Sequence, residues 1–160
     1  MGAKERRERE REQRKSQILD TARALLLEKG MNGTSINQIA KRSELSVGAI
    51  YFYFKDKEEL FAALQVEGLE LLRRKISQAV DSKMSPEKKI RSIASAYLQF
   101  SEEHKNYFDI INYFLTSPET IFSEKLKKEI DEHGNASINT LTLAIREGMN
   151  CGKFKAVDPR

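Results

Sequence analysis

Residues 34–60 read TSINQIAKRSELSVGAIYFYFKDKEEL and decide the fold of this chain. Their spacing predicts two short helices, a tight turn between them and the start of a third helix. Either Thr34 or Ser35 can cap the first helix, and Ser35 with Gln38 has the spacing of a capping box. Ser46 is placed to cap the second helix. Two short helices joined in this way are the arrangement of a helix-turn-helix.

The second short helix presents small residues first and tyrosines after them. Ile50 and Phe54 lie four residues apart and are expected to face the core. In a helix-turn-helix, the N-terminal end of the second helix meets base edges while neighbouring groups bind phosphates. Asp56 and Glu59 have the spacing of a cap for the third helix, which places Lys57 in its first turn. Free N–H groups and the helix dipole make that turn a phosphate site.

These residues resemble the DNA-binding domain of the TetR family of bacterial transcriptional regulators. The resemblance covers roughly residues 15–65 and has several fixed spacings. It rests on T-S-I-N-Q-I-A-K, on L-S-V-G-A-I-Y-F-Y-F and on K-D-K-E-E-L-F. It implies a homodimeric, all-helical repressor or activator. Such a protein has an N-terminal DNA-binding domain and a C-terminal domain for ligand binding and dimerisation.

The resemblance and the residue chemistry together predict which side chains contact DNA. Lys57 and two tyrosines are expected to bind phosphates through an ammonium group and two hydroxyls. The small residues that open the second helix can read only shape or thymine methyl groups, and the glycine among them allows close approach of the backbone. The predicted DNA-binding residues are Thr34, Ser35, Ser46, Val47, Gly48, Ala49, Tyr51, Tyr53 and Lys57.

The composition agrees with a small all-α protein. A chain of 160 residues with 39% hydrophobic residues can form one to two small domains with a helical core. No alternating run rich in Val, Ile and Thr suggests a strand. A net charge of +4 permits nucleic-acid binding without demanding it. The single cysteine suits a reducing cytosol, and no apolar run approaches the length of a membrane span, so we expect a cytoplasmic protein.

We expect a charged extension at residues 1–14, the helix-turn-helix domain at 15–60 and a helical ligand-binding and dimerisation domain at 61–160. Residues 4–15 read KERREREREQRK, with seven basic and four acidic side chains. One interpretation is a solvated, salt-bridged start of a helix. The other is a basic arm that reaches flanking phosphates or a minor groove through Arg6, Arg7, Arg9, Arg11 and Arg14.

Apolar periodicity predicts the remaining helices. One helix occupies residues 16–29 and stops at Gly30, and another begins at Lys57 and in the family transmits ligand binding to the DNA-binding domain. A helix starts at Ser85-Pro86, and a long helical segment runs from Pro118 to Gly152. Gly134-Asn135, in the middle of that segment, is expected to be a kink or a pocket-facing defect.

Seven of the thirteen aromatic residues lie between Tyr97 and Phe122. Core packing is the simplest interpretation, and an apolar pocket with a few polar groups that orient a ligand is the alternative, which the resemblance favours. The candidate ligand-binding residues are Tyr97, Phe100, Phe108, Asn112, Tyr113, Phe122, His133 and Asn139. Because the two histidines have no cysteine or carboxylate cluster at metal spacing, no metal or cofactor is expected.

The predicted mechanism combines these parts. A homodimer places two recognition helices in successive major grooves of a palindromic double-stranded operator, about 34–36 Å apart. An apolar or amphipathic effector favours a different separation of the helices and weakens operator binding. The alternative is a ligand-independent helical interaction module without an effector pocket. The chain has no nucleophile, base and acid constellation, so we do not expect an enzyme.

The C-terminal end has the signature of a new helix start. Asp158-Pro159 is a cap followed by a favoured first helical residue. Members of the TetR family usually continue with two more helices that form the dimer interface. We therefore expect a chain that is truncated at its C-terminus.

Overall fold

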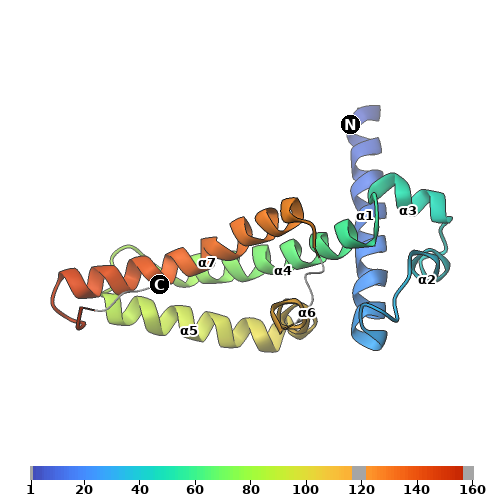
Figure 1. Cartoon of the computed structure of the whole chain (residues 1–160). Helices are drawn as coiled ribbons and strands as arrows, with labels where there is room; N and C mark the ends of the chain where they lie inside the picture. The colour runs from blue at the N-terminus through green and yellow to red at the C-terminus, as the bar shows by residue number, and fades with distance from the viewer. Residues whose placement is uncertain (1, 117–121, 157–160) are drawn as a thin grey trace. The chain divides into compact units, whose positions relative to one another are not determined.

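The computed structural model describes residues 2–116 and 122–156. Over these residues the chain forms seven helices and no strand, which confirms the all-α prediction (Figure 1). The helices are α1 (Ala3–Lys29), α2 (Ile36–Arg42), α3 (Val47–Tyr53), α4 (Lys57–Ala79), α5 (Pro86–Glu103), α6 (Lys105–Thr116) and α7 (Glu124–Asn150). None of these described helices has the length and apolar content of a membrane span.

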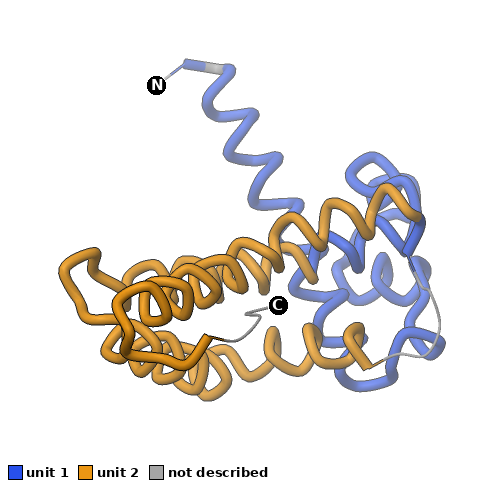
Figure 2. Tube along the Cα trace, turned by 60° about the vertical axis from the view of Figure 1, so that its left-hand side comes forward, with its two compact units in different colours: residues 1–64, 117–123 blue, residues 65–116, 124–160 orange. Residues whose placement is uncertain are grey.

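The chain forms two compact units, which Figure 2 colours separately. Unit 1 comprises residues 1–64 and 117–123, and unit 2 comprises residues 65–116 and 124–160. Helix α4 belongs to both units, and it runs without a break through residue 60, where the sequence predicted a domain boundary. The N-terminal and C-terminal units of the chain therefore share one continuous helix.

Unit 1 contains the helix-turn-helix and the long helix that supports it. The first helix begins at Ala3 rather than at residue 16, so the charged extension continues it. It ends at Gly30, as predicted, where a φ of 68° suits glycine and the Gly30 N–H donates to the Leu26 carbonyl at 2.8 Å. Each helix contributes fully buried side chains to the core of this unit, among them Ile18, Ile39, Ile50, Leu60 and Phe61.

Unit 2 is a helical bundle in which α5 packs against both α6 and α7. Ser85 caps α5 and Pro86 occupies its first turn, as predicted. The core of the unit is a cluster of Leu69, Leu72, Ile76, Ile93, Ala96, Phe100, Ile111 and Ala144. The nearly buried ammonium of Lys89 on α5 pairs with Glu147 on α7 at 2.6 Å, which compensates its charge.

The last long helix differs from its prediction at both ends. It begins at Glu124, and Phe122 and Ser123 before it are not helical. The start predicted at Pro118 and the one predicted at Asp158-Pro159 lie outside the described residues. Gly134 and Asn135 do not interrupt the helix, because α7 runs continuously from Glu124 to Asn150.

The turn after α7 folds back onto the helix and provides a test of its packing. A methyl group at Gly148 would lie 2.0 Å from Cδ2 and Cε2 of the Phe154 ring. Gly148→Ala should therefore expel that ring and cost about 1–3 kcal/mol of unfolding free energy, measured by urea denaturation. In a Phe154→Ala background, the same change should be neutral or stabilising, because alanine favours a helix over glycine by about 1 kcal/mol. An equal loss in both backgrounds would contradict this packing.

Candidate DNA-binding surface and effector cavity

The first short helix of the motif begins with the predicted capping box. The Ser35 hydroxyl accepts from the Gln38 N–H at 3.3 Å, and the Gln38 side chain accepts from the Ser35 N–H at 2.9 Å. Thr34 is not the cap. Its side chain is buried, 1% exposed, and its hydroxyl donates to the Gly30 carbonyl at 2.8 Å. Thr34 therefore stabilises the loop after α1. Because its hydroxyl is buried and already bonded, we do not propose it as a direct DNA contact.

Two contacts with α1 set the direction of α2. The Gln17 side chain donates to the Ser43 carbonyl at 2.9 Å, at the C-terminal end of α2. Arg42 pairs with Glu28 at 2.7 Å on the surface. The core faces of both helices are packed as well, so polar contacts and apolar packing together hold α2 on α1.

Helix α3 has the form expected of a recognition helix. The Ser46 hydroxyl accepts from the Ala49 N–H at 3.1 Å, and Ser46 thus caps α3, as predicted. Ile50 is fully buried and Phe54 nearly so, which anchors one side of the helix. The other side is open to solvent, with Gly48 and Tyr51 exposed and Phe52 71% exposed. Val47, Ala49 and Tyr53 are half-buried at the edges of the open face.

The start of α4 is capped by acidic side chains. The Asp56 carboxylate accepts from the Glu59 N–H at 2.8 Å, and the Glu59 carboxylate accepts from the Lys55 N–H at 2.5 Å. This confirms Asp56 as the predicted cap. It also closes the connection between α3 and α4 and fixes where Lys57 lies.

Lys57 has a partner that the sequence did not reveal. Its ammonium donates to the Met31 carbonyl at 2.5 Å and lies 5.7 Å from the centre of the Phe61 ring. Burial lowers the pKa of the Lys57 ammonium from its ordinary value. The side chain therefore joins the loop after α1 to the first turn of α4 within unit 1. A phosphate at this position would have to share or replace the Met31 carbonyl.

Unit 2 contains a cavity of about 550 Å³ whose walls are almost wholly apolar. This volume lies within the range of about 300–1,000 Å³ that is usual for small-molecule sites. All four helices of the unit line it. The residues are Gln65, Leu69, Leu72 and Ile76 from α4, Ile90, Ile93, Ala94 and Tyr97 from α5, Ile111 and Leu115 from α6, and Ile130, Asp131, Gly134, Asn135, Ser137, Ile138 and Leu141 from α7.

Of the eight predicted ligand-binding residues, only Tyr97 lines this cavity. Phe100 is fully buried in the core, Phe108 stacks edge-on against Tyr97 and Asn112 donates to the Phe108 carbonyl. The remaining four also lie elsewhere: Tyr113 stacks against Phe114, Asn139 is exposed, His133 contacts Glu70 and Phe122 belongs to unit 1. For these seven residues, core packing or a surface position replaces the predicted pocket role.

Two lining residues carry buried polar atoms that have no hydrogen-bond partner. The Gln65 side chain is 3% exposed, and its Oε1 has no hydrogen-bond partner. The Ser137 hydroxyl is likewise buried without a partner. An unpaired buried polar atom is costly. The signal for Gln65 in the sequence is one amide within the apolar stripe of α4.

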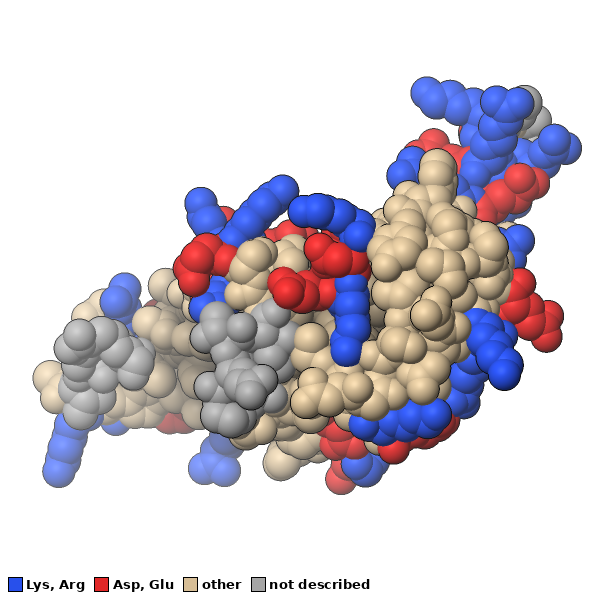
Figure 3. Space-filling model, turned by 45° about the vertical axis from the view of Figure 1, so that its right-hand side comes forward, with Lys and Arg blue, Asp and Glu red and all other residues tan. Residues whose placement is uncertain are grey.

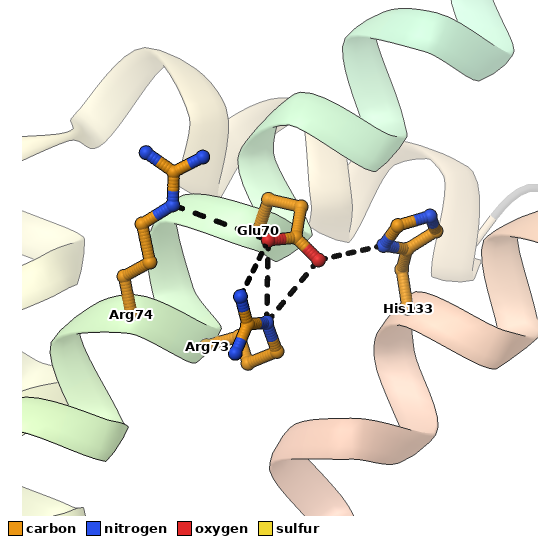
Figure 4. A network of polar contacts seen from close by, with 4 residues as sticks. All are labelled: Glu70, Arg73, Arg74 and His133. Carbon is orange, nitrogen blue, oxygen red and sulfur yellow. Dashed lines mark hydrogen bonds and ion pairs between the residues drawn. The ribbon is translucent and has the colours of Figure 1, made fainter.

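A polar network joins α4 to α7 close to the cavity (Figure 4). The Glu70 carboxylate on α4 accepts from Arg73 at 2.9 Å and contacts Nδ1 of His133 on α7 at 2.8 Å, with Arg74 at 4.0 Å. Hydrogen bonds from Arg73 and then His133 lower the pKa of Glu70 from 4.5 to about 2. Glu70 and His133 thus connect two walls of the cavity.

This network predicts a pH dependence of stability. A carboxylate whose pKa is lowered by folding contributes stability that is complete above its unfolded pKa of 4.5 and is lost as the pH falls toward about 2. Glu70→Gln should therefore destabilise the chain most above pH 4.5, and the difference from wild type should shrink at lower pH, measured by urea denaturation between about pH 6 and 3. Glu132→Gln, at an exposed position of α7, is the control. A difference independent of pH would count against the network.

The known proteins that this chain resembles in the comparisons below are transcriptional regulators. Residues 18–64 match the sequence family described as "Bacterial regulatory proteins, tetR family". The uncharacterized HTH-type transcriptional regulator YhgD of Bacillus subtilis is 25% identical over 146 residues, which cover 91% of this chain and 74% of that protein.

Two solved structures share the fold. The transcriptional regulator FadR from Bacillus subtilis in complex with stearoyl-CoA matches with a TM-score of 0.76 and 24% identity, over 91% of this chain and 76% of that one. AibR in complex with isovaleryl coenzyme A and operator DNA matches with a TM-score of 0.77 and 22% identity, over 91% and 77%.

The capped helix-turn-helix on its helical platform, followed by a helical bundle, defines a DNA-binding transcriptional regulator. The matched residues include the whole motif and the first two turns of α4. Its helix-turn-helix domain, residues 18–64, belongs to the TetR family of bacterial transcriptional regulators.

Proposed function

We propose that this chain is a ligand-responsive repressor that binds a palindromic operator as a homodimer. The observation that carries the proposal is the apolar cavity of about 550 Å³, lined in part by α4, the helix that also begins in the DNA-binding unit. A ligand that moves α4 in unit 2 would act directly on an element of unit 1. Regulation then follows from differential binding of the ligand to two arrangements of the helices. The chain acts by binding, and no catalytic role is proposed.

The effector proposed for the cavity is an acyl thioester of coenzyme A. Two relatives of the same fold are named as complexes with such molecules, stearoyl-CoA and isovaleryl coenzyme A. The apolar walls suit an acyl chain. Both polar atoms are buried in the structure, and a turn of each side chain toward the cavity would let the Ser137 hydroxyl donate to the thioester carbonyl and the Gln65 amide oxygen accept from an N–H of the carrier. Each polar atom would then gain the partner that it lacks.

The proposed DNA contacts follow the open face of α3 and the capped start of α4. Ser35, Ser46, Tyr51, Tyr53 and Lys57 bind phosphates, while the small residues Val47, Gly48 and Ala49 let the helix approach the bases. Tyr51 is 52% exposed. Lys57 reaches a phosphate by exchanging the Met31 carbonyl for it.

Charge and hydroxyl contacts can be separated by salt dependence. Lys57→Ala should lower the slope of log K against log salt by about one on any duplex, because one counterion fewer is released. Tyr51→Phe should reduce affinity about tenfold on all sequences without changing the slope, because a neutral hydrogen bond is lost. Fluorescence anisotropy with random-sequence duplexes measures both. A loss confined to one sequence would contradict the phosphate role.

The cavity can be tested at Gly134, where an added Cβ would meet nothing closer than 3.9 Å. Gly134→Leu should fill part of the cavity. The apparent affinity for isovaleryl-CoA or stearoyl-CoA, obtained from the ligand-induced shift in melting temperature, should then fall at least tenfold, while DNA binding is retained. Gly134→Ala adds one methyl group and should leave ligand binding unchanged. Free coenzyme A is the control for binding through the carrier alone.

The competing function is a helical interaction module that needs no effector. It predicts that no acyl-CoA shifts the melting temperature or releases DNA, with wild type and Gly134→Leu behaving alike. Stabilisation of about 2.7 kcal/mol at a ligand concentration of 100 Kd, as linkage requires, would favour the ligand-responsive regulator.

A further inference from the structure

One face of α1 changes its character along the helix. Within the DNA-binding unit this face is apolar and contributes buried residues such as Ile18, Ala22 and Leu25 to the core. At about 100° per residue, the same face continues toward the N-terminus. There it consists of basic residues, namely Lys4, Arg7, Arg11, Arg14 and Lys15. We call these five residues the basic stripe.

The charges of α1 are sorted around the helix, although they alternate in the sequence. All five residues of the stripe lie within about 60° of Arg11, with Glu8 at the edge. Glu5, Glu10 and Glu12 lie about 100–120° away, and Arg6 and Arg9 lie on the opposite side. Arg6 is paired there with Glu10 at 3.7 Å. Figure 3 shows Lys and Arg side chains gathered around the N-terminal end of the chain.

The basic stripe lies beside the recognition helix. The Arg11 guanidinium lies over the Phe52 ring of α3, with 5.9 Å to the ring centre. Phe52 is 71% exposed and belongs to the open side of α3, next to Tyr51. This contact places the middle of the stripe at the edge of the DNA-binding surface, and Lys4 and Arg7 extend about one to two turns beyond it.

We propose that the basic stripe binds backbone phosphates of the duplex that flanks the segment contacted by α3. The proposal rests on DNA binding by the helix-turn-helix and adds a second contact region to it. Its residues extend over about 16 Å of helix, which corresponds to about five base pairs of duplex. The stripe supplies affinity and orientation, because contacts to phosphates fix the position of a protein on the duplex and carry no direct sequence information. Arg6 and Arg9 take no part in this contact.

Two matched double variants test the stripe. Lys4→Gln with Arg7→Gln removes two charges from the stripe but keeps Arg11 on Phe52, whereas Arg6→Gln with Arg9→Gln removes two charges from the opposite side. Both variants have the same net charge, and glutamine retains helix propensity. Affinity for a random-sequence duplex of about 40 base pairs is measured against salt concentration, with helix content checked by circular dichroism.

The first variant should lower the slope of log K against log salt by about two and weaken binding at least tenfold at low salt, because two phosphate contacts are lost. The second variant should keep the wild-type slope. Equal losses of affinity in both variants would mean that net charge alone causes the effect, and would contradict the proposal. Unchanged affinity in both variants would contradict it as well. A wild-type chain that binds no duplex at low salt would instead overturn DNA binding itself, and the stripe with it.

Discussion

The structure depends on the continuity of α4. Leu60, Phe61 and Leu64 are fully buried in unit 1, and further along the same helix Leu69, Leu72 and Ile76 belong to the core of unit 2. Backbone hydrogen bonds tie each turn of this helix to the next. The helix-turn-helix unit and the helices that line the cavity therefore share one continuous element, α4. The proposed regulation depends on this shared helix.

The motif could be predicted from the sequence because its determinants are local. The capping box of Ser35 and Gln38, the Ser46 cap and the stop at Gly30 depend on residues within a turn of one another, and the structure confirms them. Thr34 shows the limit of such reasoning. A threonine and a serine in sequence both fit a cap, and only the loop after α1 decides which of them is buried.

The cavity could not be predicted to the same extent, because it depends on which faces of four helices oppose one another. The aromatic residues between positions 97 and 122 led us to predict a ligand pocket there, yet the walls of the cavity are mainly Leu and Ile side chains. Aromatic side chains fill space, and Phe100 does so at the centre of the core. Gly134 was expected to be a kink or a pocket-facing defect, and it lines the cavity without interrupting α7.

The contact between Lys57 and the Met31 carbonyl gives the DNA-binding surface an internal competitor. The Lys57 ammonium already has a hydrogen-bond partner. The free energy gained on binding a phosphate would therefore be only the difference between a phosphate and a carbonyl as acceptor. In the proposed DNA contact, transfer of the Lys57 ammonium to a phosphate would also remove a bond from the loop after α1, and that loop would gain freedom. An encounter that placed no phosphate within reach would leave the lysine on the Met31 carbonyl, so the proposed contact would favour well-aligned duplexes before any base is read.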